Sequence, residues 1–78
     1  MLKLTNIKIN GNAIEMLVLI EGDTDKAYSL TLDVSGEYYS VISSDIPPEY
    51  KIYERQAKTA LRKYHGKQLP EEITSMWY

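Results

Sequence analysis

The order of hydrophobic and polar residues in the first part of the chain predicts β-strands joined by turns. Residues 28–34 alternate strictly, with Tyr, Leu, Leu and Val on one side and Ser, Thr and Asp on the other. The pair Asn10-Gly11 lies between two apolar stretches and tolerates the two positive φ values of a type I′ hairpin turn. Ser35-Gly36 is a second tight-turn candidate, and residues 21–26 have the composition of a polar loop. We expect a four-stranded antiparallel β-meander over residues 1–44.

The second part of the chain has the spacing of an amphipathic helix. Pro47-Pro48 cannot donate hydrogen bonds to a sheet, and Pro48 suits a first helical turn. The apolar side chains that follow recur at helical steps, and they are Tyr50, Tyr53, Ala57, Ala60, Leu61 and Tyr64. This pattern predicts a helix over residues 48–65, ended by Gly66 as a left-handed cap. Residues 70–78 form either a short C-terminal helix, favoured by two acids in its first turn, or a tail.

These elements predict one α+β domain over residues 1–78, with the helix packed on one face of the sheet. A chain of 78 residues has no room for a second domain. It contains no Cys and one His, which excludes a disulfide framework, a zinc finger and a thiol nucleophile. Stability must therefore come from packing or from self-association.

The two turns also predict which apolar residues share a face of the sheet. The face expected under the helix carries Leu2, Leu4, Leu17, Leu19, Tyr28, Leu30, Leu32, Tyr39 and Val41. In this register Leu2 pairs with Leu19, Leu4 with Leu17, Ile7 with Ile14, Leu32 with Tyr39 and Leu30 with Val41. The opposite face then carries Ile7, Ile9, Ile14, Met16, Val18, Ile20, Tyr38 and Ile42.

An exposed apolar patch of that size is unusual on a monomer, so something is expected to cover it. The C-terminal tail with Trp77, a second copy of the chain, or a functional partner would each do so. A β-bulge near Thr5-Asn6 would instead re-aim the strand and shrink the patch. The candidate partner or self-association face therefore comprises Ile7, Ile9, Ile14, Met16, Val18, Ile20, Tyr38, Ile42 and Trp77.

Tyrosine replaces phenylalanine throughout this chain, which contains seven Tyr, one Trp and no Phe. A buried Tyr needs water or a partner for its hydroxyl, so these rings suit rims and interfaces. We expect Tyr28, Tyr53 and Tyr64 to belong to the core. Tyr38, Tyr50, Trp77 and Tyr78 are the candidates for contacts outside the domain.

Charge is divided unevenly along the chain, although the net charge is only −2. Residues 1–49 are acidic and residues 50–78 are basic. Within the expected helix, a basic stripe lies beside Tyr50 and consists of Lys51, Arg55, Lys58 and Arg62. Basic groups beside aromatic rings bind phosphates and stack on bases, so these five residues are candidate anion or nucleotide contacts. The stripe would bind an acidic protein patch equally well, and an ordinary solvated helix face accounts for such a stripe more often than any of these binding roles.

Catalytic and metal chemistry find little support in the sequence. His65 lies at the expected helix end, where a cationic ring is favoured, and no second His or Cys completes a nucleophile–base pair. The acidic stretch over residues 21–25 lacks the spacing of a calcium loop. There is no phosphate-binding glycine motif. We expect no enzymatic activity, no metal and no cofactor.

The longest apolar run covers residues 16–20, too short to span a bilayer, and the start of the chain shows no signal-peptide pattern. These features lead us to expect a soluble, cytoplasmic protein without a membrane partner.

Three features resemble small uncharacterised accessory proteins of Firmicute phages and integrative mobile elements. They are the stretch Asp45-Ile46-Pro47-Pro48-Glu49-Tyr50, the helix with Ala57 and Ala60, and the Trp77-Tyr78 ending. The resemblance implies an inhibitor of host defence that binds and occludes its target. Our leading hypothesis is a non-catalytic protein-binding module that pairs with itself or with a host protein. The alternative is nucleic-acid or nucleotide binding through the basic stripe.

Overall fold

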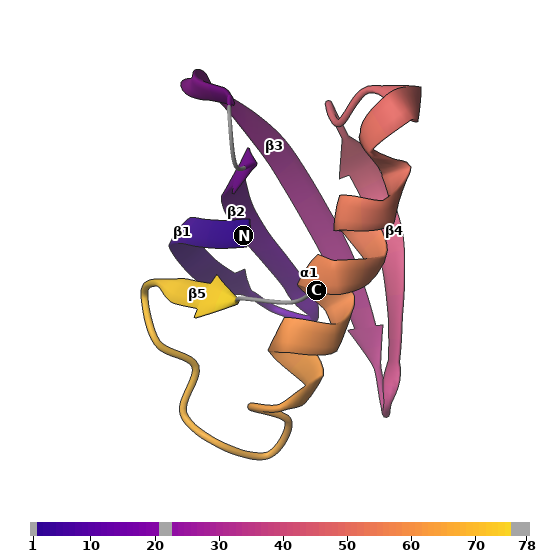
Figure 1. Ribbon diagram of the computed structural model, residues 1–78. Coiled ribbons are helices and arrows are strands. Elements are labelled where there is room, and N and C mark those ends of the chain that lie inside the picture. Colours follow the sequence, from indigo (N-terminus) through magenta and orange to yellow (C-terminus); the bar gives the residue numbers. More distant parts are fainter. Residues whose placement is uncertain (1, 21–22, 76–78) are drawn as a thin grey trace.

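Four consecutive strands form the antiparallel meander that the sequence predicts. In the computed structural model, which describes residues 2–20 and 23–75, they are β1 (Leu2–Asn10), β2 (Ala13–Ile20), β3 (Asp23–Ser35) and β4 (Tyr38–Ser44). A further strand, β5 (Ile73–Ser75), pairs with β1, so the sheet order is β4-β3-β2-β1-β5 (Figure 1). The loop predicted over residues 21–26 is shorter than expected, because β3 already begins at Asp23.

The helix lies across one face of this sheet, as predicted (Figure 1). It begins with a 3₁₀ turn, η1 (Pro48–Tyr50), and continues as α1 (Lys51–Arg62), which buries Ala57, Ala60 and Leu61. The helix ends earlier than predicted. The carbonyls of Leu61 and Arg62 accept hydrogen bonds from the N–H groups of Tyr64 and His65, three residues further along, and this i→i+3 pattern tightens the chain into a turn. Gly66 then reverses direction with φ +76°.

The short C-terminal helix predicted over residues 70–78 is wrong for the described part of that segment. Residues 73–75 form β5 instead, and Ile73 pairs with Leu4 and is buried. The pairing satisfies backbone groups of β1 that would otherwise lie at a sheet edge, and it buries an apolar side chain in the core. Trp77 and Tyr78 lie outside the described residues.

Both hairpins turn one residue later than predicted. Gly11 and Gly36 occupy the first loop position in each, with φ +63° and +60°, and the residue after each has a negative φ. A single positive φ at the first position is the pattern of a type II′ turn, which requires Gly there. Ile9 therefore pairs with Ile14, and Tyr39 pairs with Val34.

A β-bulge in β1 changes the faces of the sheet more than the turns do. Between Thr5 and Lys8 the register shifts by one residue, and Asn6 adopts φ +52°. This is the bulge considered near Thr5-Asn6 from the sequence. A shift of one residue moves side chains to the other face, so Leu4 pairs with Val18 and Leu2 with Ile20.

Most apolar residues of β1 and β2 consequently form one core under the helix instead of two separate faces. Five members of the predicted partner face are buried in that core, namely Ile7, Ile14, Met16, Val18 and Ile20. The prediction that they form an accessible face is therefore wrong. Leu17 and Leu19 lie on the opposite face instead of under the helix, and they are half-buried among polar neighbours such as Thr5 and Ser29. Ile9, Tyr38 and Ile42 remain exposed.

Candidate functional site

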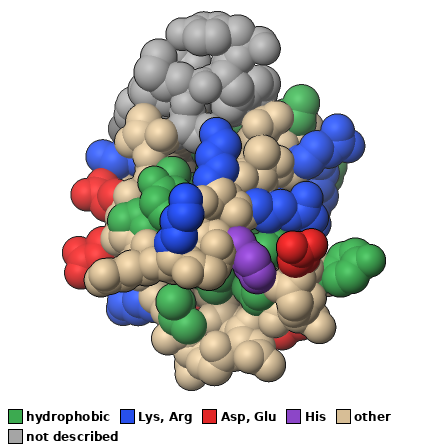
Figure 2. Space-filling model, turned by 90° about the horizontal axis from the view of Figure 1, so that it is seen from below, with side chains coloured by type: hydrophobic (Ala, Val, Ile, Leu, Met, Phe, Trp, Pro, Cys, Tyr) green, Lys and Arg blue, Asp and Glu red, His purple; other side chains and the backbone are tan. Residues whose placement is uncertain are grey.

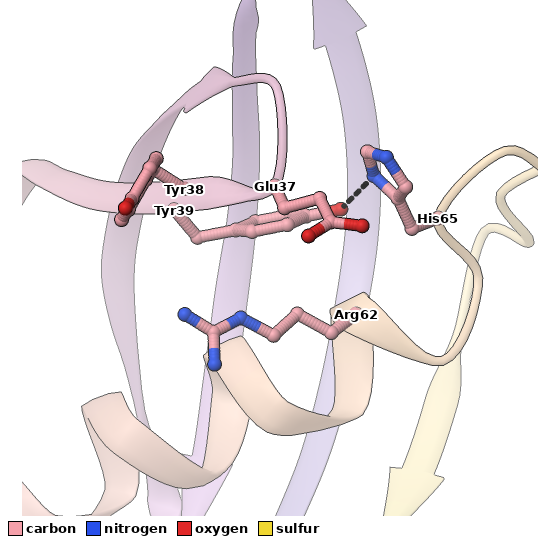
Figure 3. Close-up of a pocket in the computed structure, with 5 residues that line it drawn as sticks. All are labelled: Glu37, Tyr38, Tyr39, Arg62 and His65. Carbon is pink, nitrogen blue, oxygen red and sulfur yellow. Dashed lines mark hydrogen bonds between the residues drawn. The ribbon is translucent and has the colours of Figure 1, made fainter.

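A pocket of about 420 Å³ opens where the start of β4 meets the end of α1. It is lined by Glu37 from the β3–β4 turn, Tyr38 and Tyr39 from β4, Arg62 from the last turn of α1, and His65 (Figure 3). Its size lies within the range of small-molecule sites in proteins. Figure 2 shows this end of the molecule, where the histidine is at the surface with an acidic side chain beside it and basic side chains gathered around.

Tyr39 is the fixed element of the pocket. Its ring is buried between the helix and the sheet, and its hydroxyl lies 3.1 Å from Nδ1 of His65. The two rings meet edge to face with their centroids 6.2 Å apart. This contact holds His65 in place just beyond the helix, although the side chain itself is exposed.

Arg62 lies over the same tyrosine ring. Its guanidinium carbon is 5.8 Å from the ring centroid, which is the geometry of a cation–π contact. Among the described residues Arg62 forms no ion pair. The ring therefore positions the guanidinium but leaves its hydrogen-bond donors available.

Glu37 and Tyr38 complete the pocket from the β3–β4 hairpin. In Figure 3 the Glu37 carboxylate lies on the same side as the Tyr39 hydroxyl and the His65 ring, whereas Tyr38 points away from them. Tyr38 is 77% exposed. In the described part of the chain, Glu37 has no ion-pair partner. The pocket thus combines a free carboxylate, a free guanidinium and an imidazole.

The basic stripe predicted on the helix exists, but its two ends differ in their surroundings. At the first end, Lys51 forms a 2.9 Å ion pair with Glu54. Burial opposes ionisation of Glu54, but hydrogen bonds from Ser44 and Lys51 and the charges of Lys51 and Lys58 outweigh it and lower the pKa of that carboxyl. The stripe is therefore partly neutralised here. At the other end, Arg62 faces the pocket, and Arg55 between them is exposed.

Tyr50 does not lie beside the stripe as predicted. Its ring packs against the core between two other tyrosines, with centroids 6.4 Å from Tyr28 and 5.8 Å from Tyr53. Tyr50 is therefore a half-buried packing residue in η1, and its role as an anion contact stays a prediction. Tyr28, Tyr53 and Tyr64 pack against the core as predicted.

The free edge of the sheet at β4 is the second notable surface. None of the seven residues of β4 is charged, and Tyr38, Val41 and Ile42 are exposed. The register between β3 and β4 shifts between Thr31 and Leu32, so Ile42 lies in a bulge. The regular part of this edge is Tyr38–Val41, which leads directly into the pocket.

Sequence reasoning singled out two of the five pocket residues, Arg62 and Tyr38, but assigned them to different sites. It missed Glu37 and Tyr39 and gave His65 only a role at the helix end. Tyr39 and His65 are 26 residues apart, and no local pattern links a strand residue to a turn at that separation. The excess of tyrosine was the one available signal.

No group of three His, Cys, Asp or Glu side chains that could hold a metal ion occurs among residues 2–20 and 23–75. Over the same residues, the structure contains no helix with the length and apolar character needed to cross a membrane. No protein-family model matches the chain, and neither a curated protein nor a solved structure matches it.

Proposed function

We propose that the protein is a non-catalytic protein-binding module whose partner adds an extended strand to the free edge of β4. The composition of that edge carries the proposal, because seven uncharged residues include Tyr38 and Ile42, which are 77% and 59% exposed. Edge strands are usually protected by charged residues, Pro or bulges, which block pairing with other chains. In β4 the bulge lies at Ile42, so Tyr38–Val41 remains open, and there main-chain hydrogen bonds would supply affinity and alternate side chains specificity.

The charges beside the edge define the chemistry of the partner. Glu37 and Asp45 immediately flank β4, one at each end. A segment that pairs with β4 and carries a basic side chain at each end would face both acids. Opposite charges across a strand pair stabilise it, and like charges destabilise it.

The two acids do not oppose a second copy over the regular edge, because antiparallel pairing of two copies over Tyr38–Val41 places Glu37 of each opposite Ile42 of the other. We propose a different protein as the partner, since the resemblance to mobile-element proteins implies a host defence protein that is occluded.

A designed peptide tests the edge directly. The probe is an alternating Val-Thr segment with Lys at both ends, and the control peptide carries Glu at both ends. We expect the Lys peptide to slow amide hydrogen exchange in Tyr38–Val41, as measured by NMR, because its main chain pairs with that edge. The Glu peptide should have a much weaker effect.

Two matched variants locate the effect. Ile42→Lys places a charge on the edge, and Ile9→Lys places the same charge on another exposed isoleucine, in β1. The first should abolish protection by the peptide and the second should leave it unchanged. If neither peptide protects β4, edge pairing is wrong. If light scattering shows a dimer that Ile42→Lys dissociates and Ile9→Lys does not, the occupant is a second copy instead.

A further inference from the structure

We infer that the pocket of Glu37, Tyr38, Tyr39, Arg62 and His65 binds a nucleoside monophosphate whose base carries an amino group. The pocket shares Glu37 and Tyr38 with the β4 edge but does not require strand pairing there, and it deepens the nucleotide alternative by moving it from the helix stripe to the pocket. The pocket residues come from two elements that the fold brings together, and each supplies one part of the recognition.

Arg62 supplies the donors for a phosphate, and His65 lies at the other end of the Tyr39 ring, beside the Glu37 carboxylate (Figure 3). The guanidinium of Arg62 is held over the Tyr39 ring and has no ion pair within the described residues, so its planar set of N–H groups can bind two phosphate oxygens. Nδ1 of His65 is engaged with the Tyr39 hydroxyl, and its Nε2 points away from Arg62, so the phosphate contact rests on the guanidinium (Figure 3).

Glu37 explains why the ligand is more than an inorganic anion. A carboxylate beside a phosphate site weakens binding of a bare anion by repulsion. It becomes favourable when the ligand also presents N–H donors, because an ionised carboxylate only accepts hydrogen bonds. The exocyclic amino group of cytosine or adenine is such a donor, and Glu accepts from it in base recognition.

Tyr38 supplies a surface for the base. Tyr38 is 77% exposed at the rim of the pocket, and its ring points away from the Glu37 carboxylate, so a base stacked on it lies at the outer edge of the pocket (Figure 3). Bases stack on exposed aromatic rings with little dependence on sequence. The pocket of about 420 Å³ therefore presents a phosphate end, an amino-accepting carboxylate and a stacking ring.

The test is an NMR titration of the ¹⁵N-labelled full chain at low salt with CMP, UMP and inorganic phosphate. CMP and UMP are matched in size, but only CMP has an exocyclic amino group. We expect CMP to shift the signals of residues 37–39, 62 and 65 and to bind several-fold more tightly than UMP or phosphate. Ile42→Lys should bind CMP normally, which separates this site from pairing at β4.

Variants divide the recognition into its parts. Arg62→Ala should weaken the binding of CMP and of phosphate by at least roughly ten-fold, because each ligand loses charge-assisted hydrogen bonds. Arg55→Ala is the matched control, since it removes the same charge from an exposed position on the same helix outside the pocket. Tyr38→Ala should weaken CMP binding roughly five-fold and leave phosphate binding unchanged. Tyr38→Phe should bind CMP like the parent, because it keeps the stacking ring.

The affinities of Glu37→Gln distinguish a nucleotide site from a plain anion site. If Glu37 accepts a hydrogen bond from the base, this variant loses the preference for CMP over UMP. If the variant instead binds CMP, UMP and phosphate all more tightly, the pocket is a plain anion site and the inference is wrong. Equal losses in Arg55→Ala and Arg62→Ala would assign binding to the helix stripe as a whole and overturn it. The absence of any shift with millimolar CMP would also overturn it.

Discussion

The hydroxyl of Ser44, at the end of β4, donates a 2.7 Å hydrogen bond to Oε2 of Glu54 on α1. The same hydroxyl oxygen accepts the N–H of Ile46 at 3.2 Å. One side chain therefore fixes both the exit of the chain from the edge strand and the start of the helix. At its other end α1 is joined to β4 by the contacts of Arg62 and His65 with Tyr39. The pocket depends on this alignment of helix and edge strand.

The contribution of Glu54 to stability should disappear in acid. Its pKa in the folded protein is lowered, so the group stabilises the fold above its ordinary pKa, and this stabilisation is lost as the pH falls through the folded value. Glu54→Gln should therefore be less stable than the parent at neutral pH, and the difference should shrink on acidification. Urea unfolding at several pH values measures it. The exposed Glu49→Gln is the control, and a difference that grows in acid would contradict the assignment.

Two neighbouring residues of β2 report the register of the sheet. Val18 is fully buried under the helix, whereas Leu17 is half-buried on the other face. Val18→Ala should lower the free energy of unfolding by about 2 kcal/mol through loss of packing. Leu17→Ala should cost less, although it removes more atoms. Thermal and urea unfolding compare the two, and the reverse order would support the register without a bulge.

The bulge in β1 should be sensitive to the residue at position 6. Asn6 has φ +52°, a conformation that Asn tolerates and that a β-branched residue does not. Asn6→Gly should be neutral or slightly stabilising, and Asn6→Val should destabilise by about 1–2 kcal/mol. Thr5→Val, in the regular part of the same strand, serves as the control in the same unfolding measurements. Equal effects of Asn6→Val and Thr5→Val would argue against the left-handed bulge.

The hydroxyl of Tyr39 should set the position of the proton on His65. Tyr39→Phe removes the group that lies 3.1 Å from Nδ1 and keeps the ring under Arg62. We expect the ¹⁵N signals of both ring nitrogens of His65 to shift at constant pH, because the tautomer balance changes. Tyr38→Phe changes an exposed neighbouring hydroxyl and should leave these signals in place. Unchanged signals in Tyr39→Phe would show that the hydrogen bond is absent in solution.

Strands, turns and the helix were predictable from the sequence because their signals are local. Alternation over residues 28–34 and the helical spacing of Tyr53, Ala57 and Leu61 follow from the geometry of single elements. The glycines marked both hairpins, but the position of each glycine within its turn was misjudged. The short strand β5 carried too little pattern to be distinguished from a helix.

The candidate site was much less predictable than the fold. Val41 and Tyr39 were placed on the correct face, yet the contact between Tyr39 and His65 depends on where the helix crosses the sheet. The helix stripe could be found from spacing alone. The pairing of Lys51 with Glu54 is also local, at i,i+3, but that Arg62 faces a pocket could not be found, because it depends on the strand packed beside the helix.

The amino-acid sequence by itself determined the class of elements, their order and the apolar residues available for a core, since hydrophobic period and turn chemistry act over a few residues. Only the tertiary structure decided which of these residues share a face. One extra residue at Asn6 brings Leu2 and Leu4 to the side of Val18 and Ile20, and so merges two predicted faces into one core. The physical reason is that side chains alternate along a strand, so a one-residue shift, favoured by burial against the helix, reverses every face beyond it.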